Sequence, residues 1–148
     1  MQLSTKGRYA VMALLDLQAI QKESKGACPV KLSEIAERQE ISLSYLEQLF
    51  AQLRRGGLVK SVRGPGGGYL LQNDAAETWL SDVVMAVDEP IKIARCKKGE
   101  GNCMSNGSRC NTHHLWSALE DHLNYFLQTV SLEMVSSNHL PQVGCDKG

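Results

Sequence analysis

The stretch Ser42–Leu71, SLSYLEQLFAQLRRGGLVKSVRGPGGGYLL, decides the fold of this chain. Its first half repeats apolar residues at helical spacing and ends at Gly56 and Gly57, which predicts a helix over residues 42–54. Residues 58–63 then alternate as in a strand, the glycine-rich run 64–68 turns the chain, and residues 69–71 return as a second strand. A helix followed by a glycine-tipped β-hairpin is the second half of a winged helix.

The residues before this stretch supply the rest of that fold. A short helical pattern over 32–39 is separated from the next helix only by Glu40 and Ile41, which predicts a helix-turn-helix. If Glu40 needs a left-handed backbone, a glutamate there costs ~1 kcal/mol. A longer helix is expected from Ser4 or Thr5 to about Gln21, and a short one from Thr78 or Ser81 to Val87. The fold class is therefore mainly α with a small β-hairpin wing, and residues 1–87 are assigned as a winged-helix DNA-binding domain.

Length and charge agree with that assignment. The chain has 148 residues, enough for one modest core. Its apolar run Tyr9–Leu15 is far shorter than the ~20 residues that span a bilayer, so we expect a cytoplasmic protein with no membrane partner. Residues 1–70 carry ten Lys and Arg against six Asp and Glu, a net charge of +4, while the remainder carries −4. The positive half suits a polyanion.

The expected DNA contacts fall into two groups. Residues at the start of the second helix of a helix-turn-helix meet base edges, and glutamine pairs with adenine while glutamate accepts from cytosine. Cations near the wing bind phosphates or enter a narrow minor groove. Ser44 and Glu47 also have the spacing of a capping box, so Glu47 has a competing role in starting the helix. The predicted DNA-binding residues are Ser42, Ser44, Tyr45, Glu47, Gln48, Arg54, Arg55, Lys60 and Arg63.

Residues 88–111 have neither helical nor strand periodicity and hold the main chemical signal. Cys96, Cys103, Cys110 and His113 follow one another at spacings of x6, x6 and x2. Thiolates with an imidazole suit zinc or an iron-sulfur cluster. Wide gaps favour a larger group over a single zinc ion, but zinc and redox thiols stay open. His113 lies one helical turn from Cys110 and is preferred over His114 as the ligand, whereas Cys28 and Cys145 are expected to bind nothing.

A final helix is expected from Thr112 to about Val135, and we assign residues 112–136 to dimerisation and 137–148 to a flexible tail. About twenty-four helical residues would extend ~36 Å, longer than so small a core can cover. A second copy of the chain is the natural cover, which predicts a homodimer. The apolar stripe expected at the interface is Trp116, Leu119, Leu123, Phe126 and Val130.

An enzymatic role is not expected. The run GPGGG at 64–68 is followed by neither the Gly-Lys-Ser/Thr sequence nor the helix of a phosphate-binding loop. No other catalytic motif is apparent in the sequence.

Four longer stretches carry a family resemblance. They are LSTKGRYAVMALLDL at 3–17, ISLSYLEQLFAQLRRGGLV at 41–59, SVRGPGGGYLL at 61–71 and CNTHHLW at 110–116. Together they resemble a winged-helix family of iron-sulfur cluster regulators that also includes nitric-oxide sensors. The resemblance implies a homodimer on double-stranded operator DNA, control of cluster-assembly genes, and the cluster-assembly machinery as the donor of a [2Fe-2S] cluster. It implies ligation by Cys96, Cys103, Cys110 and His113, and DNA reading by Ser44, Glu47, Gln48 and Arg63.

The chain departs from the family pattern in ways that leave alternatives open. Each gap between the cysteines is one residue longer than the pattern, Glu40 stands where glycine is usual, and the C-terminal tail differs. A nitric-oxide-sensing repressor of the same family is one alternative, but those sensors resemble proteins with an N-terminal aspartate ligand where this chain has Arg8. A zinc-stabilised interaction protein without DNA specificity is the other.

Overall fold

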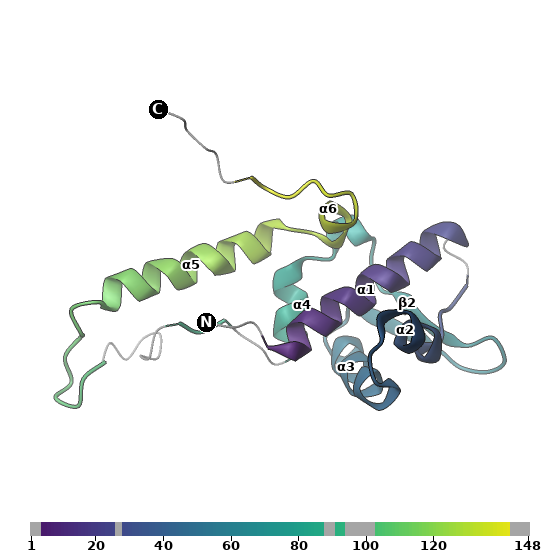
Figure 1. Ribbon diagram of the computed structural model, residues 1–148, viewed down its shortest axis with the longest axis horizontal. Helices are drawn as coiled ribbons and strands as arrows, with labels where there is room; N and C mark the ends of the chain where they lie inside the picture. The colour runs from purple at the N-terminus through teal and green to yellow at the C-terminus, as the bar shows by residue number, and fades with distance from the viewer. Residues whose placement is uncertain (1–3, 26–27, 88–90, 94–102, 143–148) are drawn as a thin grey trace.

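The structure, a computed structural model, describes residues 4–25, 28–87, 91–93 and 103–142. Figure 1 shows a rounded body from which one long helix projects, with its far end at the loop around residue 110. The elements in chain order are α1 (Thr5–Glu23), α2 (Leu32–Gln39), α3 (Leu43–Arg55), β1 (Val59–Val62), β2 (Gly68–Leu71), the 3-10 helix η1 (Ala75–Glu77), α4 (Leu80–Ala86), α5 (His113–Thr129) and α6 (Leu132–Ser136).

Helix α1 organises the body. The Ser4 side chain accepts a hydrogen bond from the Lys6 N–H and caps its first turn, as the sequence predicts. The helix contacts α2, α3, α4, α6 and β2, and its buried face includes Ala10, Ala13, Leu14 and Leu17. These side chains share one core with Phe50 of α3 and Val83 of α4. The helix predicted from Ser4 or Thr5 is confirmed, and it ends at Glu23.

An ion pair fixes α2 against α1. Arg38 donates to both carboxylate oxygens of Asp16, with Nη2 at 3.0 Å from Oδ2 and Nε at 3.1 Å from the same atom. This hydrogen bonding raises the pKa of the Arg38 guanidinium. Bidentate geometry gives the contact orientation as well as strength, so the first helix of the helix-turn-helix is held in a fixed position.

The turn between α2 and α3 forms as the sequence predicts. Glu40 has φ 53° and ψ 42°, which is the left-handed conformation that favours glycine. The Ile41 N–H donates to the Ala36 carbonyl at 3.1 Å and closes the end of α2. The glutamate therefore occupies a strained position in a turn that is otherwise satisfied.

The wing is an antiparallel hairpin in which Val59 pairs with Leu71 and Val62 with Gly68. Tyr69 of the wing also forms a β-bridge with Val30, in which each N–H donates to the other residue's carbonyl, at 3.0 and 2.8 Å. Periodicity in the sequence does not predict this bridge. A side chain at Gly68 would overlap the Val30 backbone, so only glycine permits this approach. The bridge ties the hairpin to the loop before α2.

The predicted single C-terminal helix is wrong in one respect. It breaks at Val130, which is extended at φ −108° and ψ 120°, and the separate helix α6 begins at Leu132. The break forms because Val130 accepts from the Leu80 N–H at 2.9 Å and Leu132 donates to Thr78 at 2.9 Å. Val130 is 0% exposed, so it belongs to the core of its own chain and not to an exposed stripe. In the described residues, no helix is long and apolar enough to cross a membrane.

Candidate DNA interface and metal centre

The start of α3 presents polar side chains to solvent. The Ser42 hydroxyl caps the helix by accepting from the Tyr45 N–H at 3.4 Å, and it lies 3.0 Å from the Ser44 hydroxyl. Because Ser42 is the N-cap, Ser44 already lies inside the helix and the predicted Ser44–Glu47 capping box does not form. Glu47 and Gln48 are exposed on the next turn. The Glu47 carboxylate therefore does not take part in a capping box at the start of α3.

Tyr45 has a different role from its neighbours. It is half-buried, and its ring meets that of Tyr9 edge-on at a centroid distance of 5.9 Å. Tyr9, Tyr45, Ser44 and Gln48 line one hollow together with Glu40. The start of α3 is therefore braced against α1, and a hollow lies beside the side chains predicted to read bases.

The predicted cations divide between two faces. Arg54 donates to the Ser61 hydroxyl at 3.3 Å, which joins the end of α3 to β1, and Arg55 donates to the Ala51 carbonyl at 3.4 Å. Arg63 is exposed at the wing. Lys60 instead lines a separate hollow with Gln18 and Gln21 of α1 and Glu133 of α6, so the structure does not bring it to the surface formed by α3.

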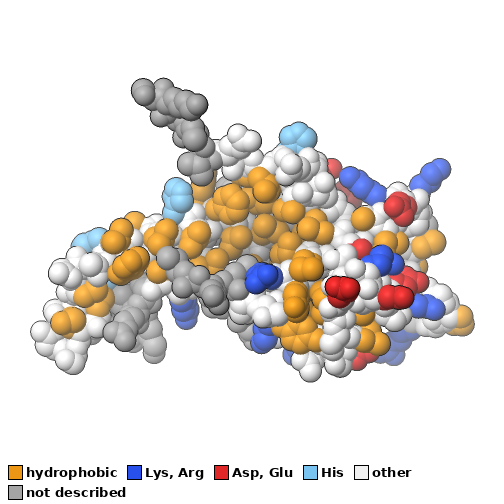
Figure 2. All heavy atoms as spheres, in the orientation of Figure 1, with side chains coloured by type: hydrophobic (Ala, Val, Ile, Leu, Met, Phe, Trp, Pro, Cys, Tyr) orange, Lys and Arg blue, Asp and Glu red, His pale blue; other side chains and the backbone are white. Residues whose placement is uncertain are grey.

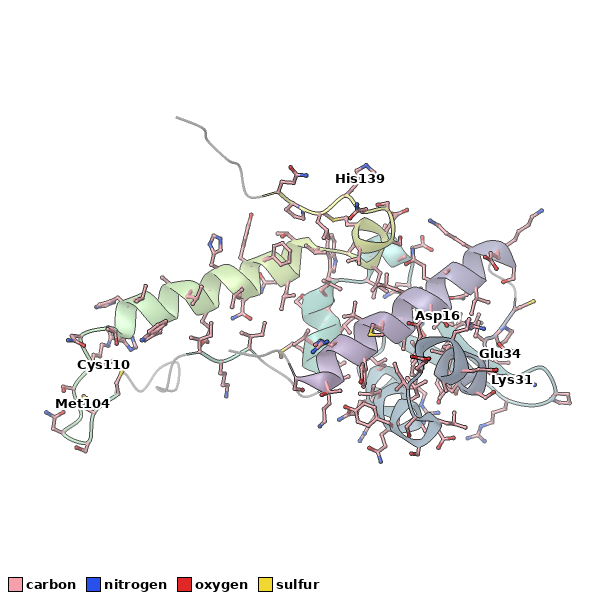
Figure 3. The ribbon with its side chains drawn as sticks, in the orientation of Figure 1. Asp16, Lys31, Glu34, Met104, Cys110 and His139 are labelled. Atoms are coloured by element: carbon pink, nitrogen blue, oxygen red, sulfur yellow. The ribbon has the colours of Figure 1, made fainter. Side chains whose placement is uncertain are left out.

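The cysteine-rich segment lies at the far end of α5. Figure 3 places Met104 and Cys110 there, well away from Asp16 and Glu34 in the body. The N–H groups of Cys103 and Met104 both donate to the Ser108 carbonyl at 3.1 Å, and Gly107 closes this turn with φ 82°. The turn brings Cys103 back toward the beginning of α5.

Two of the predicted ligands are in contact. The Cys103 Sγ lies 3.1 Å from the His113 Nδ1, and the Cys110 Sγ lies 3.7 Å from the Thr112 hydroxyl. The His113 N–H donates to the Cys110 carbonyl at 3.1 Å, so α5 begins directly on this segment. Cys96 and Cys145 lie outside the described residues, and among the described residues no group of three or more potential metal ligands is assembled.

His114 and Cys28, which the sequence does not predict as ligands, are both exposed. His114 is exposed and its ring lies edge-on to that of His113 at 5.5 Å, and it is the His113 ring that contacts the Cys103 thiol. Cys28 is an exposed free thiol in the loop before α2.

Helix α5 carries a large apolar surface. Trp116 and Phe126 are each 38% exposed, and Leu119 and Leu123 are half-buried. Figure 2 shows apolar side chains along the projecting helix, whereas most of the charged side chains in this view lie on the rounded body. The apolar stripe predicted from the sequence does not include Leu115 and Tyr125, which are strongly exposed and lie outside the spacing of that stripe. Large exposed apolar patches mark interaction surfaces.

The comparisons with known proteins assign the family. Residues 3–138 match the Rrf2 family, described as iron-dependent transcriptional regulators. The chain belongs to the Rrf2 family. It is 52% identical over 138 residues to the HTH-type transcriptional regulator IscR of Photorhabdus laumondii, covering 93% of this chain and 80% of that protein. It is 51% identical over 144 residues to IscR of Escherichia coli, covering 97% and 85%.

Solved structures of Rrf2 regulators have the same fold. CymR, the global cysteine regulator of B. subtilis, matches with a TM-score of 0.75 at 30% identity, covering 93% of this chain and 98% of CymR. IscR of T. potens matches with a TM-score of 0.74 at 31% identity, covering 97% and 94%. These findings confirm the winged-helix prediction and the resemblance, and they make this Rrf2 protein a transcriptional regulator.

Proposed function

We propose that this protein senses an iron-sulfur cluster and binds operator DNA as a homodimer to control iron-sulfur cluster assembly genes. The observation that carries the proposal is the 3.1 Å contact between the Cys103 thiol and the His113 imidazole, with Cys110 one helical turn before His113. The similarity to regulators named IscR supports the same assignment. The cluster-assembly machinery is the expected cluster donor, and the protein is expected to act in the cytoplasm without catalysing a reaction.

The donor set fits a [2Fe-2S] cluster. Cys103, Cys110 and His113 offer two thiolate sulfurs and an imidazole nitrogen, and Cys96 is the proposed fourth ligand. When bound, the cluster would supply a redox-active centre, held by these thiolates and the imidazole. The residues of this chain contribute by holding the donors at the start of α5, where helix geometry fixes His113 against Cys103.

The arrangement of helices offers a route from this site to DNA. Helix α4 contacts both α5 and α3, and a Cβ at Gly56 would lie 2.8 Å from the Ala86 Cβ, so the end of α3 lies tightly against α4. Packed interfaces of this kind transmit displacement because they do not deform continuously. A change in the position of α5 would therefore reach the helix that carries Glu47 and Gln48.

The test is ligand replacement in anaerobically purified full-length protein. Cys96→Ala, Cys103→Ala, Cys110→Ala and His113→Ala should each abolish or strongly reduce the visible chromophore, with iron and sulfide content falling in parallel. Cys28→Ala is the matched control, because it removes an exposed thiol outside the site and should leave the spectrum unchanged.

Two outcomes would overturn the proposal. A colourless wild-type protein holding one zinc per chain would make this a structural zinc site. Full iron and sulfide in Cys103→Ala or Cys110→Ala would show that the ligands lie elsewhere.

A further inference from the structure

A hollow of about 800 Å³ lies between α1, the wing, η1 and α6, and it is separate from the hollow beside Tyr45. Its walls belong to elements that pack against one another, because α1 contacts both β2 and α6 and η1 contacts α6. Small-molecule sites in proteins are concave and typically enclose ~300–1,000 Å³. The hollow is therefore large enough for a small molecule, and its lining decides which chemical class fits.

Gln18 of α1 lines this hollow and carries an acceptor that no donor satisfies. The residue is 5% exposed, and its Nε2 donates to the Ser136 hydroxyl of α6 at 3.3 Å. Its Oε1 is buried and has no hydrogen-bond partner among the described residues. Gln21 differs, since its Oε1 accepts from the Leu71 N–H at 3.1 Å. Buried polar atoms are almost always paired, so the Gln18 oxygen requires a donor from outside the described chain.

Charged side chains surround the same hollow. Lys22 and Lys25 come from the end of α1, and Lys60 comes from β1. Asp74 precedes η1, and Glu133 lies on α6. None of the three ammonium groups lies within ion-pairing distance of a carboxylate in the described part of the chain. With three cations and two anions, the lining has a formal charge of +1.

We propose that this hollow binds a dicarboxylic amino acid, a small zwitterion with a net charge of −1. Its two carboxylates would pair with the lysine ammonium groups, since charge-assisted hydrogen bonds are the strong ones. Its α-ammonium would supply the missing donor to the Gln18 Oε1, and Asp74 and Glu133 would balance that charge. Such a ligand complements the lining in charge and satisfies the unpaired acceptor.

Simpler anions fit the hollow less well. A dicarboxylate without an amino group brings no donor for Gln18, and an amino acid with a neutral side chain leaves the excess positive charge unbalanced. A DNA phosphate is repelled by Asp74 and Glu133 and likewise brings no donor. The Lys60 ammonium therefore serves the amino-acid site in this proposal and not a DNA contact.

Binding in the hollow would reach the wing. A ligand held by both Lys60 and Lys22 joins β1 to α1, where the Gln21 side chain already receives the Leu71 N–H of β2. The hairpin that carries Arg63 would then be held more firmly against the body. Neither step involves the cysteine-rich segment, so the inference goes beyond the proposed function and does not depend on a cluster.

The test is calorimetric titration of the full-length protein with L-aspartate and L-glutamate. Succinate and glutarate are the matched probes without an amino group, and L-glutamine has an uncharged side chain. At least one of the two acidic amino acids should bind saturably. Its matched dicarboxylate and L-glutamine should bind about tenfold more weakly or not at all, because a charge-assisted contact is lost. Hydrogen exchange of residues 59–71 should slow several-fold in the bound protein.

Four variants locate the site. Lys60→Met and Lys22→Met each remove one exposed ammonium group and should weaken binding of that amino acid about tenfold. Gln18→Leu removes the acceptor and keeps a side chain of similar size, so it should reduce the preference for the amino acid over its matched dicarboxylate. Lys6→Met, at the other end of α1, is the control and should bind as wild type does. Circular dichroism melting shows which variants are folded, and the two hollow-lining lysine variants carry the test if Gln18→Leu is not.

Three results would overturn the inference. Absence of saturable binding by both acidic amino acids would remove the ligand class. Equal affinity for the matched dicarboxylate would show that Gln18 needs no donor from a ligand. Unchanged binding in Lys60→Met and Lys22→Met would place the amino acid elsewhere, and a loss of affinity for duplex DNA alone would make these lysines DNA contacts. None of these measurements uses the visible chromophore, so failure of the proposed cluster site and failure of this inference are distinguishable.

Discussion

The body, formed by α1 to α4, the wing and α6, differs from the arm, formed by residues 91–93 and 103–129, in what holds it together. In the body, Leu14, Leu46 and Phe50 are each 0% exposed and share one core. In the arm, α5 buries one residue, Glu120, and leaves its apolar side chains partly or largely exposed. The body is stabilised by its own buried core. The arm exposes apolar side chains, as a segment does when another chain is expected to cover it.

The body and the arm also correspond to two tasks of a sensor, which are reading DNA and responding to a bound group. A DNA-reading surface works best when it is rigid, and the helix-turn-helix is fixed by the Arg38–Asp16 ion pair and by the core beneath α3. A sensing segment must respond to what binds it, and elements that move are drawn from the less stable parts of a protein. Each prediction below perturbs one side of this division and measures whether the other side changes.

The largest effect is expected from disrupting the apolar surface of the arm. Leu123→Glu or Phe126→Glu places a charge in the surface that we expect a second α5 to cover, and burying an unpaired charge costs several kcal/mol. Sedimentation should show a monomer or aggregate in place of a dimer, while the melting transition of the body persists. Gln128→Glu, an exposed position on the same helix, is the control and should remain dimeric.

The opposite result in these two variants would reject the assignment of the interface to α5. If Leu123→Glu and Phe126→Glu both sediment as dimers of unchanged stability, α5 is not the dimer interface. The exposed apolar residues of the arm would then need another partner.

The body was largely predictable from sequence because its signals are local. Helical periodicity located α1, α2 and α3, and the glycine-rich tip located the wing between Val62 and Gly68. The break at Val130 was not predictable, since the helical spacing continues through it. What ends the helix is its pairing with Thr78 and Leu80, about fifty residues earlier in the chain.

The candidate site was predictable only where chemistry restricts residue choice. Few residues can ligate soft metals, so the spacing of Cys103, Cys110 and His113 suggested that they would meet, and the structure brings Cys103 to His113. Glu120 carries no such signal, because a glutamate on an amphipathic helix is typical of a solvated face. Its carboxylate accepts a hydrogen bond from the Ile93 N–H, a contact between distant residues that periodicity cannot reveal.

A smaller effect is expected at the reading surface of the body. Glu47 is an exposed carboxylate that must approach DNA phosphates, so it disfavours operators that offer it no donor. Cluster-free wild type should bind a narrower set of operators than cluster-loaded protein, and Glu47→Ala should let the cluster-free form accept both sets. The gain on the disfavoured operators should be roughly 1–3 kcal/mol, measured as dissociation constants at one fixed salt concentration.

Gln48→Ala provides the matched comparison for Glu47→Ala, because it removes a neutral side chain from the same turn of α3. It should weaken binding, with a loss that depends on the operator. If Glu47→Ala weakens all operators equally, or leaves the dependence on the cluster untouched, the carboxylate does not link the arm to sequence choice.

The smallest expected effect lies in the turn before α3 and concerns the body alone. Glu40 adopts φ 53°, so Glu40→Gly should relieve backbone strain and raise the free energy of unfolding by about 0.5–1 kcal/mol. Glu40→Ala removes the same charge but keeps the Cβ, and should show little of this gain in denaturant titrations. Equal gains in both variants would assign the effect to charge. Because this turn lies in the body, neither variant should change the lifetime of the chromophore, and a change would show that the body and the arm are coupled through the helix-turn-helix itself.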